Sequence, residues 1–206
     1  MQNLSENQKH RFLEAAHRVA DYGLVRCSSG NLSWRLEDDL AAVSASKTWL
    51  ADLRENQIAI CSIKDGQCLN GKQPSIETVF HLGVLHNRAD VNVVLHFQSP
   101  WATTVACGDP GELNFNLIFE VPVNIGQPGI VDLLTPGSAE LAEAVIEALS
   151  QHDLVILKNH GLVTVGKDFD DAIQKACFFE LTCQILLCQN QPSFIPTETT
   201  DKLTGA

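Results

Sequence analysis

An almost unbroken apolar run at residues 91–97 constrains the fold of this chain more than any other segment. Such a strand presents apolar side chains on both faces, so other elements must cover both faces and the strand belongs inside a sheet. Shorter apolar runs bounded by turn residues predict the remaining strands. They lie at residues 40–43, 58–63, 154–157 and 162–165, with two strands around a tight loop at 25–36 and a strand-rich segment at 113–125.

Helical spacing of apolar residues predicts helices between these strands. They cover residues 4–22, a segment from Gly137 to Leu149 and residues 170–189, and Ser99-Pro100 opens another. Residues 191–206 lose this periodicity and are predicted to form a flexible tail. The pattern indicates one α/β or α+β domain over residues 1–206, with its core at 8–190, mainly antiparallel strands and helices on both faces of the sheet.

A further helix is predicted directly after Ser75, which would cap it. Its expected core face consists of Ile76, Val79, Phe80, Gly83 and Val84.

The charge balance excludes several classes of partner. Lys plus Arg number 14 and Asp plus Glu number 25, which gives a formal charge of −11. A general binder of nucleic acid or of membrane surfaces would carry a basic patch, so neither class is expected. No apolar run is long enough to span a bilayer and the N-terminus lacks a hydrophobic targeting core, so we expect a cytoplasmic protein. The 7 cysteines include no CxxC pair, which favours reduced, mostly buried thiols.

Two histidines follow apolar strands at points where the chain changes direction. His96 ends the 91–97 run, and His160 lies in a turn beside Gly161, while Glu77 belongs to a third segment. Two imidazoles and a carboxylate from three segments can form an open divalent-metal site, in which substrate or water takes the remaining position. Each residue also has a purely structural interpretation. Either histidine can satisfy a local hydrogen bond, and Glu77 can stabilise the N-terminus of its helix.

Other polar residues are spaced to complete such a site. Gln98 lies two residues after His96, so the two side chains point to the same side of the strand. His81 follows Glu77 by one helical turn, where it can support the site or satisfy a local hydrogen bond. Two hydroxyl-rich loops, at 28–31 and 44–47, can hold a phosphate through backbone amides, hydroxyls and an ammonium group, or can be ordinary turns.

Taken in order, these segments resemble the class II aldolase/adducin family over residues 8–190. The landmarks are Ser29-Gly30-Asn31-Leu32-Ser33, Val43-Ser44-Ala45-Ser46, Pro74-Ser75-Ile76-Glu77, His96-Phe97-Gln98-Ser99-Pro100 and Asn159-His160-Gly161-Leu162. The resemblance implies a three-layer fold, with a central, mainly antiparallel sheet between helices, and a homotetramer with active sites at subunit interfaces. It also implies a phosphorylated sugar substrate and a divalent cation, usually zinc, with manganese or cobalt as alternatives.

Carried over residue by residue, the resemblance assigns metal binding to His96 and His160, and both metal binding and proton transfer to Glu77. Gln98 would bind the cation directly or through water. The positions that match phosphate and substrate loops are Ser29, Gly30, Asn31, Ser46, Lys47 and Ser75.

The chain departs from the family pattern at several of these positions. Gln98 stands where the family has the second histidine of a His-x-His pair, and a neutral amide oxygen binds zinc more weakly than imidazole. Lys47 replaces a glycine, and Ile76 replaces a serine. The tyrosine that gives a proton to the aldehyde half of the substrate has no counterpart, because Tyr22, at the end of the first helix, is the only tyrosine.

These observations predict a metal-dependent lyase that cleaves a ketose 1-phosphate, such as L-fuculose 1-phosphate, into dihydroxyacetone phosphate and an aldehyde. A sugar-phosphate epimerase or dehydratase on the same scaffold is one alternative, because these reactions also polarise a carbohydrate oxygen. A non-catalytic, adducin-like interaction module that has lost the metal is the other. The departures favour that module, whereas the retained Glu77, His96 and His160 favour an enzyme.

Overall fold

A single seven-stranded sheet forms the centre of the protein, which a computed structural model describes over residues 3–37 and 39–204. The strand order is β3-β2-β1-β4-β7-β6-β5. The strands are β1 (Asn31–Glu37), β2 (Leu40–Ser44), β3 (Ile58–Ser62), β4 (Val93–Phe97), β5 (Gly129–Val131), β6 (Leu154–Leu157) and β7 (Gly161–Gly166). Neighbouring strands pair antiparallel, except β5 and β6, which are parallel. The predicted mainly antiparallel sheet is confirmed.

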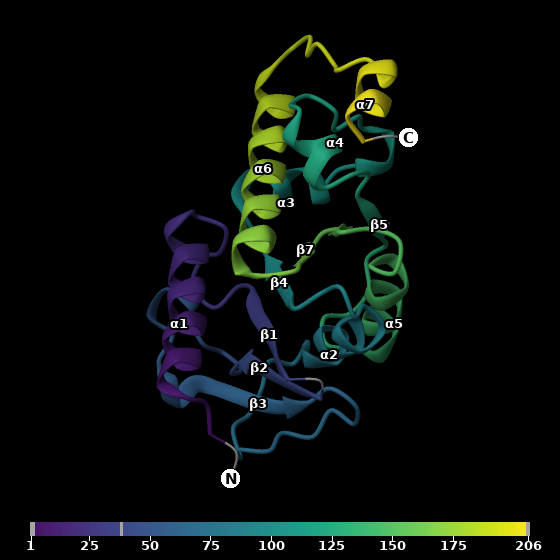
Figure 1. Ribbon diagram of the computed structural model, residues 1–206. Coiled ribbons are helices and arrows are strands. Elements are labelled where there is room, and N and C mark those ends of the chain that lie inside the picture. The colour runs from purple at the N-terminus through teal and green to yellow at the C-terminus, as the bar shows by residue number, and fades with distance from the viewer. Residues whose placement is uncertain (1–2, 38, 205–206) are drawn as a thin grey trace.

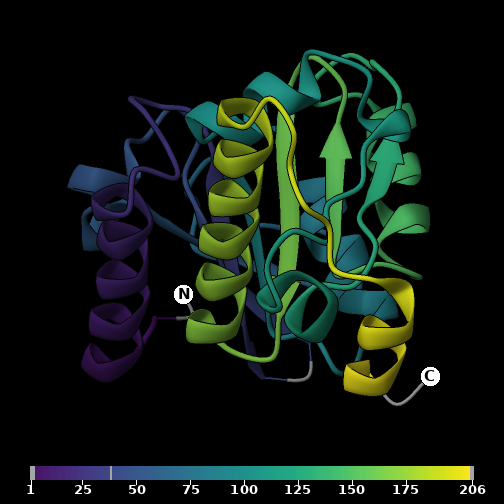
Figure 2. The ribbon, with the colours of Figure 1, turned by 90° about the horizontal axis from the view of Figure 1, so that it is seen from above.

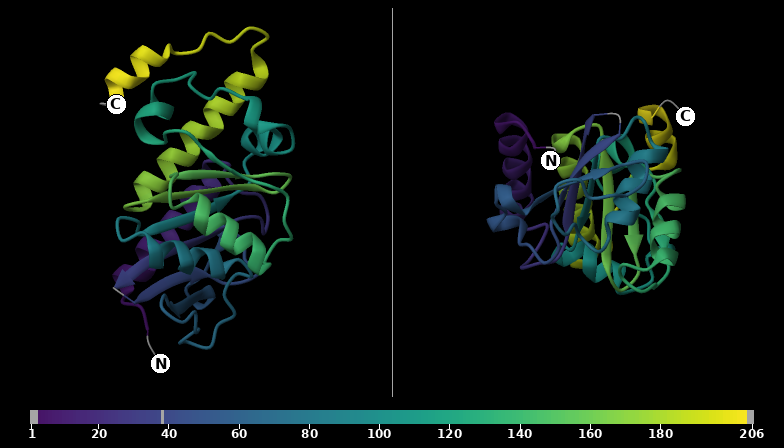
Figure 3. Two further views of the ribbon diagram at one scale, coloured as in Figure 1. Left: turned by 90° about the vertical axis from the view of Figure 1, so that its right-hand side faces the viewer. Right: turned by 90° about the horizontal axis from the view of Figure 1, so that it is seen from below.

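Helices cover both faces of this sheet (Figures 1 and 2). One face carries α1 (Glu6–Asp21), α3 (Pro100–Ala106), α4 (Glu120–Asn124) and α6 (Phe169–Cys188), whose buried residues share one apolar cluster. The other face carries α2 (Thr78–Asn87) and α5 (Ala139–Ala148), which the left view of Figure 3 presents to the reader. Every residue of β4 and β7 is buried, as expected for interior strands.

The starts of three helices are fixed by specific hydrogen bonds. Ser5 forms a reciprocal capping box with Gln8 at the start of α1, and the Ser138 side chain accepts a hydrogen bond from a backbone amide at the start of α5. At α3 the cap comes from a distant residue. The Glu180 carboxylate on α6 accepts hydrogen bonds from the amides of Trp101 (3.0 Å) and Ala102 (2.8 Å). Free amides and the positive end of the helix dipole both favour a carboxylate there, so α6 sets the position of α3.

The region around α4 differs from the sequence prediction. Instead of strands, residues 113–125 contain turns and α4. Val121 on α4 and Ile125 just after it lie one helical turn apart, and both are buried. Pro122 has no backbone N–H to donate to a strand ladder. The predicted strand-rich segment is therefore wrong. Residues Thr197–Thr204 form a short helix, α7, which packs against α4 where no regular element is expected (Figure 1). Flexibility of residues 191–206 remains a prediction.

Two predicted element boundaries near the site are also wrong. Only one strand forms within residues 25–36, because Cys27 (φ 54°) and Gly30 (φ 78°) adopt left-handed backbone conformations that interrupt an extended chain. Helix α2 begins at Thr78, and Glu77 takes the cap position expected for Ser75. The backbone N–H of Glu77 donates to the Ser75 hydroxyl at 3.3 Å, so residues 75–77 form a turn.

The shorter α2 also has a different buried face from the predicted one. Ile76 and Val79 are 61% and 60% exposed. The buried face consists instead of Thr78, Phe80, His81, Leu82, Val84 and Leu85.

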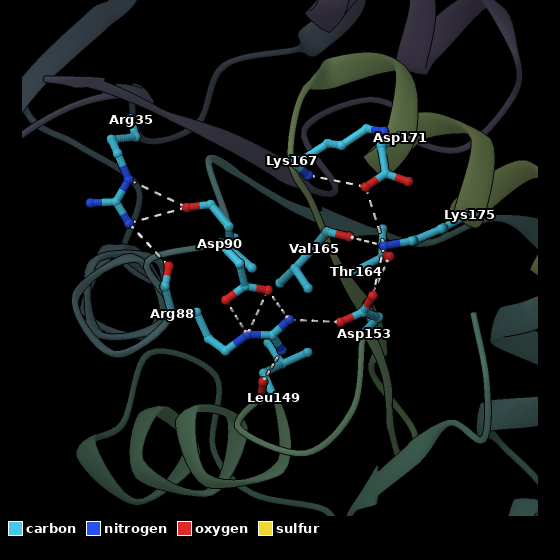
Figure 4. Close-up of polar contacts among 11 residues, drawn as sticks. Arg35, Arg88, Asp90, Leu149, Asp153, Thr164, Val165, Lys167, Asp171 and Lys175 are labelled. Atoms are coloured by element: carbon cyan, nitrogen blue, oxygen red, sulfur yellow. Dashed lines mark hydrogen bonds and ion pairs between the residues drawn. The ribbon is translucent and has the colours of Figure 1, made fainter. Parts of the chain in front are cut away.

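An ion-pair network closes the end of the sheet opposite to the histidines (Figure 4). Arg88 contacts Asp90 at 2.6 Å and Asp153 at 3.0 Å, and the buried ammonium of Lys175 lies 2.7 Å from Asp153. The Arg35 guanidinium donates to backbone carbonyls at the end of α2 and before β4. Pairing offsets part of the desolvation cost of the largely buried Arg88 and Lys175, and the contacts join α2, β4, β6 and α6.

All seven cysteines are free thiols. The prediction that most of them are buried is wrong, because only Cys61 and Cys183 are buried, while Cys27, Cys107 and Cys188 are exposed. None of the described helices combines the length and apolar character needed to cross a membrane.

Candidate metal centre

Strand pairing brings the predicted site residues to one end of the sheet. His96, near the end of β4, pairs with Asn31 at the start of β1 and with Val163 on β7. His160 directly precedes β7, and Glu77 directly precedes α2. Three segments that are distant in sequence therefore meet where β1, β4 and β7 adjoin the start of α2.

Three of the four predicted ligands, Glu77, His96 and His160, form one compact cluster. The Glu77 Oε1 atom lies 3.4 Å from His160 Nε2, and Glu77 Oε2 lies 3.6 Å from His96 Nε2. Their ligand atoms all lie within 4.8 Å of one another. The side chains of His96 and Glu77 are 2% and 5% exposed, and that of His160 is 12% exposed. The cluster is thus largely shielded from solvent, and His160 is its most exposed member.

Hydrogen bonding leaves the facing nitrogen of His96 available as a ligand. His96 Nδ1–H donates to the carbonyl of Leu162 at 2.9 Å, so in the neutral ring Nε2 carries the lone pair. Burial would raise the pKa of Glu77, but His96, the hydrogen bond from the Asn31 amide and His160 together bring it below its ordinary value. Burial and the neighbouring His96 lower the pKa of His160. At neutral pH the site therefore favours a Glu77 carboxylate beside a neutral His160 imidazole, which are the protonation states that metal ligands need.

Two buried atoms of the cluster make no hydrogen bond within the described part of the chain, Glu77 Oε1 and His160 Nδ1. A buried carboxylate oxygen that lacks a hydrogen-bond donor lowers the stability of the folded protein, and a divalent cation would supply the missing partner. Two imidazole nitrogens and a carboxylate oxygen are also a common donor set for catalytic transition metals. The residues of this centre thus fit a divalent cation, with Glu77, His96 and His160 as its ligands.

Two glycines allow the backbone to approach the cluster. At Gly161 a Cβ atom would lie 2.7 Å from Gln98 Cγ and 2.8 Å from the Phe97 carbonyl oxygen. At Gly30, whose φ is +78°, a Cβ atom would lie 2.7 Å from the His96 carbonyl oxygen. Only glycine permits this spacing without displacing β4.

A pocket of about 250 Å³ adjoins the cluster and is bordered by all four predicted metal ligands and by the six residues that the family resemblance assigned to phosphate and substrate. Its lining comprises Ser28, Ser29, Gly30, Asn31, Ala45, Ser46, Lys47, Thr48, Ser75, Ile76, Glu77, His96, Gln98, Pro136 and His160. Gln98 and His96 border the same space, as their spacing predicts. The roles of the loop residues in phosphate binding remain predictions. Thr48 is an additional lining residue that no sequence pattern singled out.

The departures from the family pattern are located as follows. Lys47 is exposed and adopts a left-handed backbone conformation (φ 60°), in keeping with a position where glycine is usual. Ile76 lines the pocket but is largely exposed. Tyr22 is 58% exposed at the end of α1 and does not line the pocket.

Sequence reasoning left the role of His81 open and missed its partners. His81 is fully buried and contacts both Ser33 and Asn31 on β1. Asn31 in turn donates a hydrogen bond to Glu77 at 2.8 Å. The i, i+2 spacing of Asn31 and Ser33 on one strand face was the available signal, but it gains meaning only when β1 is known to face α2.

Comparison with known proteins agrees with this geometry. Curated relatives include a 5-methylthioribulose-1-phosphate/5-deoxyribulose-1-phosphate aldolase from Rhodospirillum rubrum, 30% identical over 95% of this chain and 88% of its own length. An L-fuculose phosphate aldolase from Methanococcus maripaludis is 32% identical over 87% and 95% of the two chains. A 3-oxo-tetronate 4-phosphate decarboxylase from Haemophilus influenzae is 26% identical over 86% of each chain.

The solved structure of YgbL from Escherichia coli shows the same fold. It aligns with a TM-score of 0.88 at 22% identity, over 96% of this chain and 98% of that one. The sequence family described as the class II aldolase and adducin N-terminal domain matches residues 10–187. The aldolases and the decarboxylase among the relatives support a lyase. The match contains all seven strands together with Glu77, His96 and His160, so this chain belongs to the class II aldolase/adducin family.

Proposed function

We propose that this protein is a metal-dependent lyase that cleaves a ketose 1-phosphate, of the L-fuculose 1-phosphate type, into dihydroxyacetone phosphate and an aldehyde. The observation that carries the proposal is the convergence of Glu77, His96 and His160 beside a polar pocket. The names of the aldolases from R. rubrum and M. maripaludis support the substrate class.

In the proposed reaction Glu77 moves a proton. When bound, a divalent cation supplies Lewis-acid polarisation of the substrate oxygens. Cleavage breaks the bond between C3 and C4 of the sugar and leaves its electron pair on the fragment that keeps the phosphate. That fragment must then gain a proton at C3. The Glu77 oxygen Oε1 accepts no hydrogen bond from the described residues and faces His160, so as a carboxylate it is free to remove this proton in the reverse direction. In the cleavage direction Glu77 would first take up a proton from water in the pocket and then deliver it to C3.

The two loops at the pocket rim supply groups suited to the phosphate. Ser29, Ser46 and Ser75 offer hydroxyls, and Lys47 offers an ammonium group. Because the chain carries a formal charge of −11, a dianionic phosphate needs such a local cation. Lys47 would compensate for Ile76, which cannot donate a hydrogen bond at a position where serine is usual.

A decarboxylase is the second candidate, and the missing tyrosine favours it. Retro-aldol cleavage needs a group that exchanges a proton with the departing aldehyde oxygen, whereas carbon dioxide leaves a 3-oxo acid without such an exchange. Tyr22 lies away from the pocket. The relative from H. influenzae carries the name of a decarboxylase that acts on a 3-oxo acid phosphate. Epimerisation or dehydration would use the same polarised oxygens.

Proton exchange on dihydroxyacetone phosphate tests the core of the proposal. In deuterium oxide the zinc-loaded or manganese-loaded wild type should exchange one C3 hydrogen, observed by proton NMR. Glu77→Gln keeps the shape of the side chain but cannot accept the proton, so exchange should fall to background while the far-UV circular dichroism is unchanged. Lys47→Ala is the matched control, since it should weaken substrate binding and leave exchange at saturating substrate intact. Equal exchange by Glu77→Gln and wild type would remove Glu77 from this role.

A substrate panel separates the two candidate reactions. L-fuculose 1-phosphate and 5-methylthioribulose 1-phosphate report aldol cleavage through release of dihydroxyacetone phosphate. A 3-oxo-tetronate 4-phosphate reports decarboxylation through release of carbon dioxide. Turnover of the acid alone would assign the protein to the decarboxylases and refute the aldolase proposal.

The family resemblance adds expectations about assembly and surroundings. A homotetramer of the 22.5 kDa chain, with active sites at subunit interfaces, is part of the proposal and is testable by light scattering after size-exclusion chromatography. Zinc as the preferred cation and a cytoplasmic location are proposed on the same ground.

A further inference from the structure

We infer that His81 is a positioning residue that, together with Ser33, fixes the orientation of the Asn31 amide. The fixed amide holds Glu77 Oε2 by a hydrogen bond and leaves Glu77 Oε1 free to face His160. This inference rests on the proposed function, because it assigns the free oxygen to metal binding and proton transfer. His81 itself lines neither the pocket nor the metal cluster.

A continuous chain of hydrogen bonds connects Ser33 to Glu77. The Ser33 hydroxyl lies 2.8 Å from His81 Nδ1, the His81 Nε2 atom contacts Asn31 Oδ1, and Asn31 Nδ2 lies 2.8 Å from Glu77 Oε2. Ser33 and His81 are fully buried, and Asn31 and Glu77 are 8% and 5% exposed. The pocket reaches Asn31 and Glu77 but neither Ser33 nor His81, so bulk water cannot replace these two and Asn31 depends on His81 for its hydrogen bond.

The direction of every proton in this chain is fixed by chemistry. A carboxylate only accepts, so Asn31 must present its NH₂ group to Glu77 and its carbonyl oxygen to His81. That oxygen also only accepts, so His81 Nε2 must carry a proton and Nδ1 must accept from Ser33. Burial lowers the pKa of His81 to about 3, which agrees with a neutral ring. Only one arrangement therefore satisfies all four groups.

The orientation of the Asn31 amide in turn sets the orientation of the Glu77 carboxylate. If His81 did not donate, the Asn31 amide could rotate and present its oxygen to the Glu77 carboxylate, which would repel it. The carboxylate would then turn, and Oε1 would no longer face His160. Residues that hold a ligating carboxylate from behind typically change metal affinity or activity by about 10–100-fold when they are replaced.

Two substitutions at position 81 separate this role from simple filling of the core. His81→Phe retains an aromatic ring but removes both hydrogen bonds. His81→Gln retains a donor for Asn31 and an acceptor for Ser33. Thr164→Val is the matched control, because it removes another buried hydroxyl, whose 3.0 Å hydrogen bond to the Asp153 carbonyl lies at the opposite end of the sheet (Figure 4).

The measurement is the affinity for Zn²⁺ and for Mn²⁺ by chelator competition, alongside the midpoint of thermal unfolding. We expect His81→Phe to weaken both ions by about tenfold or more, and His81→Gln to stay within about threefold of wild type. Thr164→Val should lower the midpoint and leave the affinity unchanged. Deuterium exchange at C3 of dihydroxyacetone phosphate should fall in His81→Phe and recover in His81→Gln.

Several outcomes would overturn the inference. One is a folded His81→Phe variant with wild-type affinity, and another is a His81→Gln variant as weak as His81→Phe. If His81→Phe does not fold, Ser33→Ala replaces it, with an expected severalfold loss of affinity, and wild-type affinity in that variant counts against the inference. A wild type that binds neither ion overturns the inference along with the metal centre. A wild type that binds zinc but cleaves no sugar phosphate overturns only the proposed function.

Discussion

Acidification should destabilise this protein through one buried imidazole. Burial lowers the pKa of His81 from 6.5 to about 3 in the folded chain. In the unfolded chain the ring takes up a proton below about pH 6.5, whereas the folded chain resists protonation until about pH 3. The unfolded state therefore binds more protons across this window. The contribution of the neutral His81 to stability is fully present above pH 6.5 and is lost as the pH falls toward 3.

The size of the effect follows from linkage. Each pH unit inside the window costs about 1.4 kcal/mol, so the free energy of unfolding should fall by about 2 kcal/mol between pH 7.5 and pH 5.0. Carrying the pH down to about 3 would raise the loss to about 5 kcal/mol. A loss of 2 kcal/mol is a large part of the stability of an ordinary domain.

Other groups titrate in the same range, so the assay needs a reference that shares them. His81→Gln retains the hydrogen bonds but cannot take up the proton. Urea unfolding of both proteins at pH 7.5 and 5.0, at one protein concentration and with a chelator present, gives two pH dependences whose difference isolates His81. The wild type should lose about 2 kcal/mol more than the variant. Equal pH dependences would refute the assignment of a buried, neutral His81.

Three further changes have defined outcomes. Gln98→His should tighten zinc binding severalfold in a chelator competition, because imidazole is the stronger zinc ligand, and unchanged affinity would mean that side chain 98 points away from the ion. Gly30→Ala should lower the free energy of unfolding by about 1–3 kcal/mol in urea, since its Cβ would lie 2.7 Å from the His96 carbonyl oxygen at a φ of +78°, and wild-type stability would contradict that close approach. Glu180→Gln should cost about 1–2 kcal/mol in the same assay by removing the charge that caps α3, whereas no loss would show that the cap needs only a neutral acceptor.

Local signals in the sequence were sufficient for most of the secondary structure. Ser5 and Ser138 cap helices inside the predicted ranges 4–22 and 137–149, and the apolar run at 91–97 contains the fully buried β4. These features depend on neighbours within one or two turns of chain. The turns and helix α4 at 113–125 were mispredicted because their apolar residues pack on α6, a tertiary contact that periodicity does not encode. The start of α2 shifted because a hydrogen bond between Ser75 and Glu77 competes with the first helical turn.

The candidate site was predictable only in part, for a related reason. His96 and His160 could be placed at strand ends, and antiparallel neighbours bring such ends together. The hydrogen bonds of His81 depend instead on the contact between α2 and β1, and no spacing in the sequence reports that contact. Candidate ligands can thus be found in the sequence at strand ends. Residues that position those ligands can be found only when the packing of the helix layer on the sheet is known.

In the proposed reaction, the residues that match the family pattern and the residue that is missing act on different fragments of the substrate. Glu77, His96 and His160 would act on the fragment that keeps the phosphate, where an electron pair develops and a proton is exchanged, and all three are present and converge. The missing tyrosine would act on the departing fragment, which is an aldehyde in one candidate reaction and carbon dioxide in the other. Aldol cleavage and decarboxylation both leave an electron pair on the fragment that keeps the phosphate, so both reactions need the same three residues there. The departing fragment is therefore where this chain should differ from related aldolases, and the substrate panel should vary that half of the molecule first.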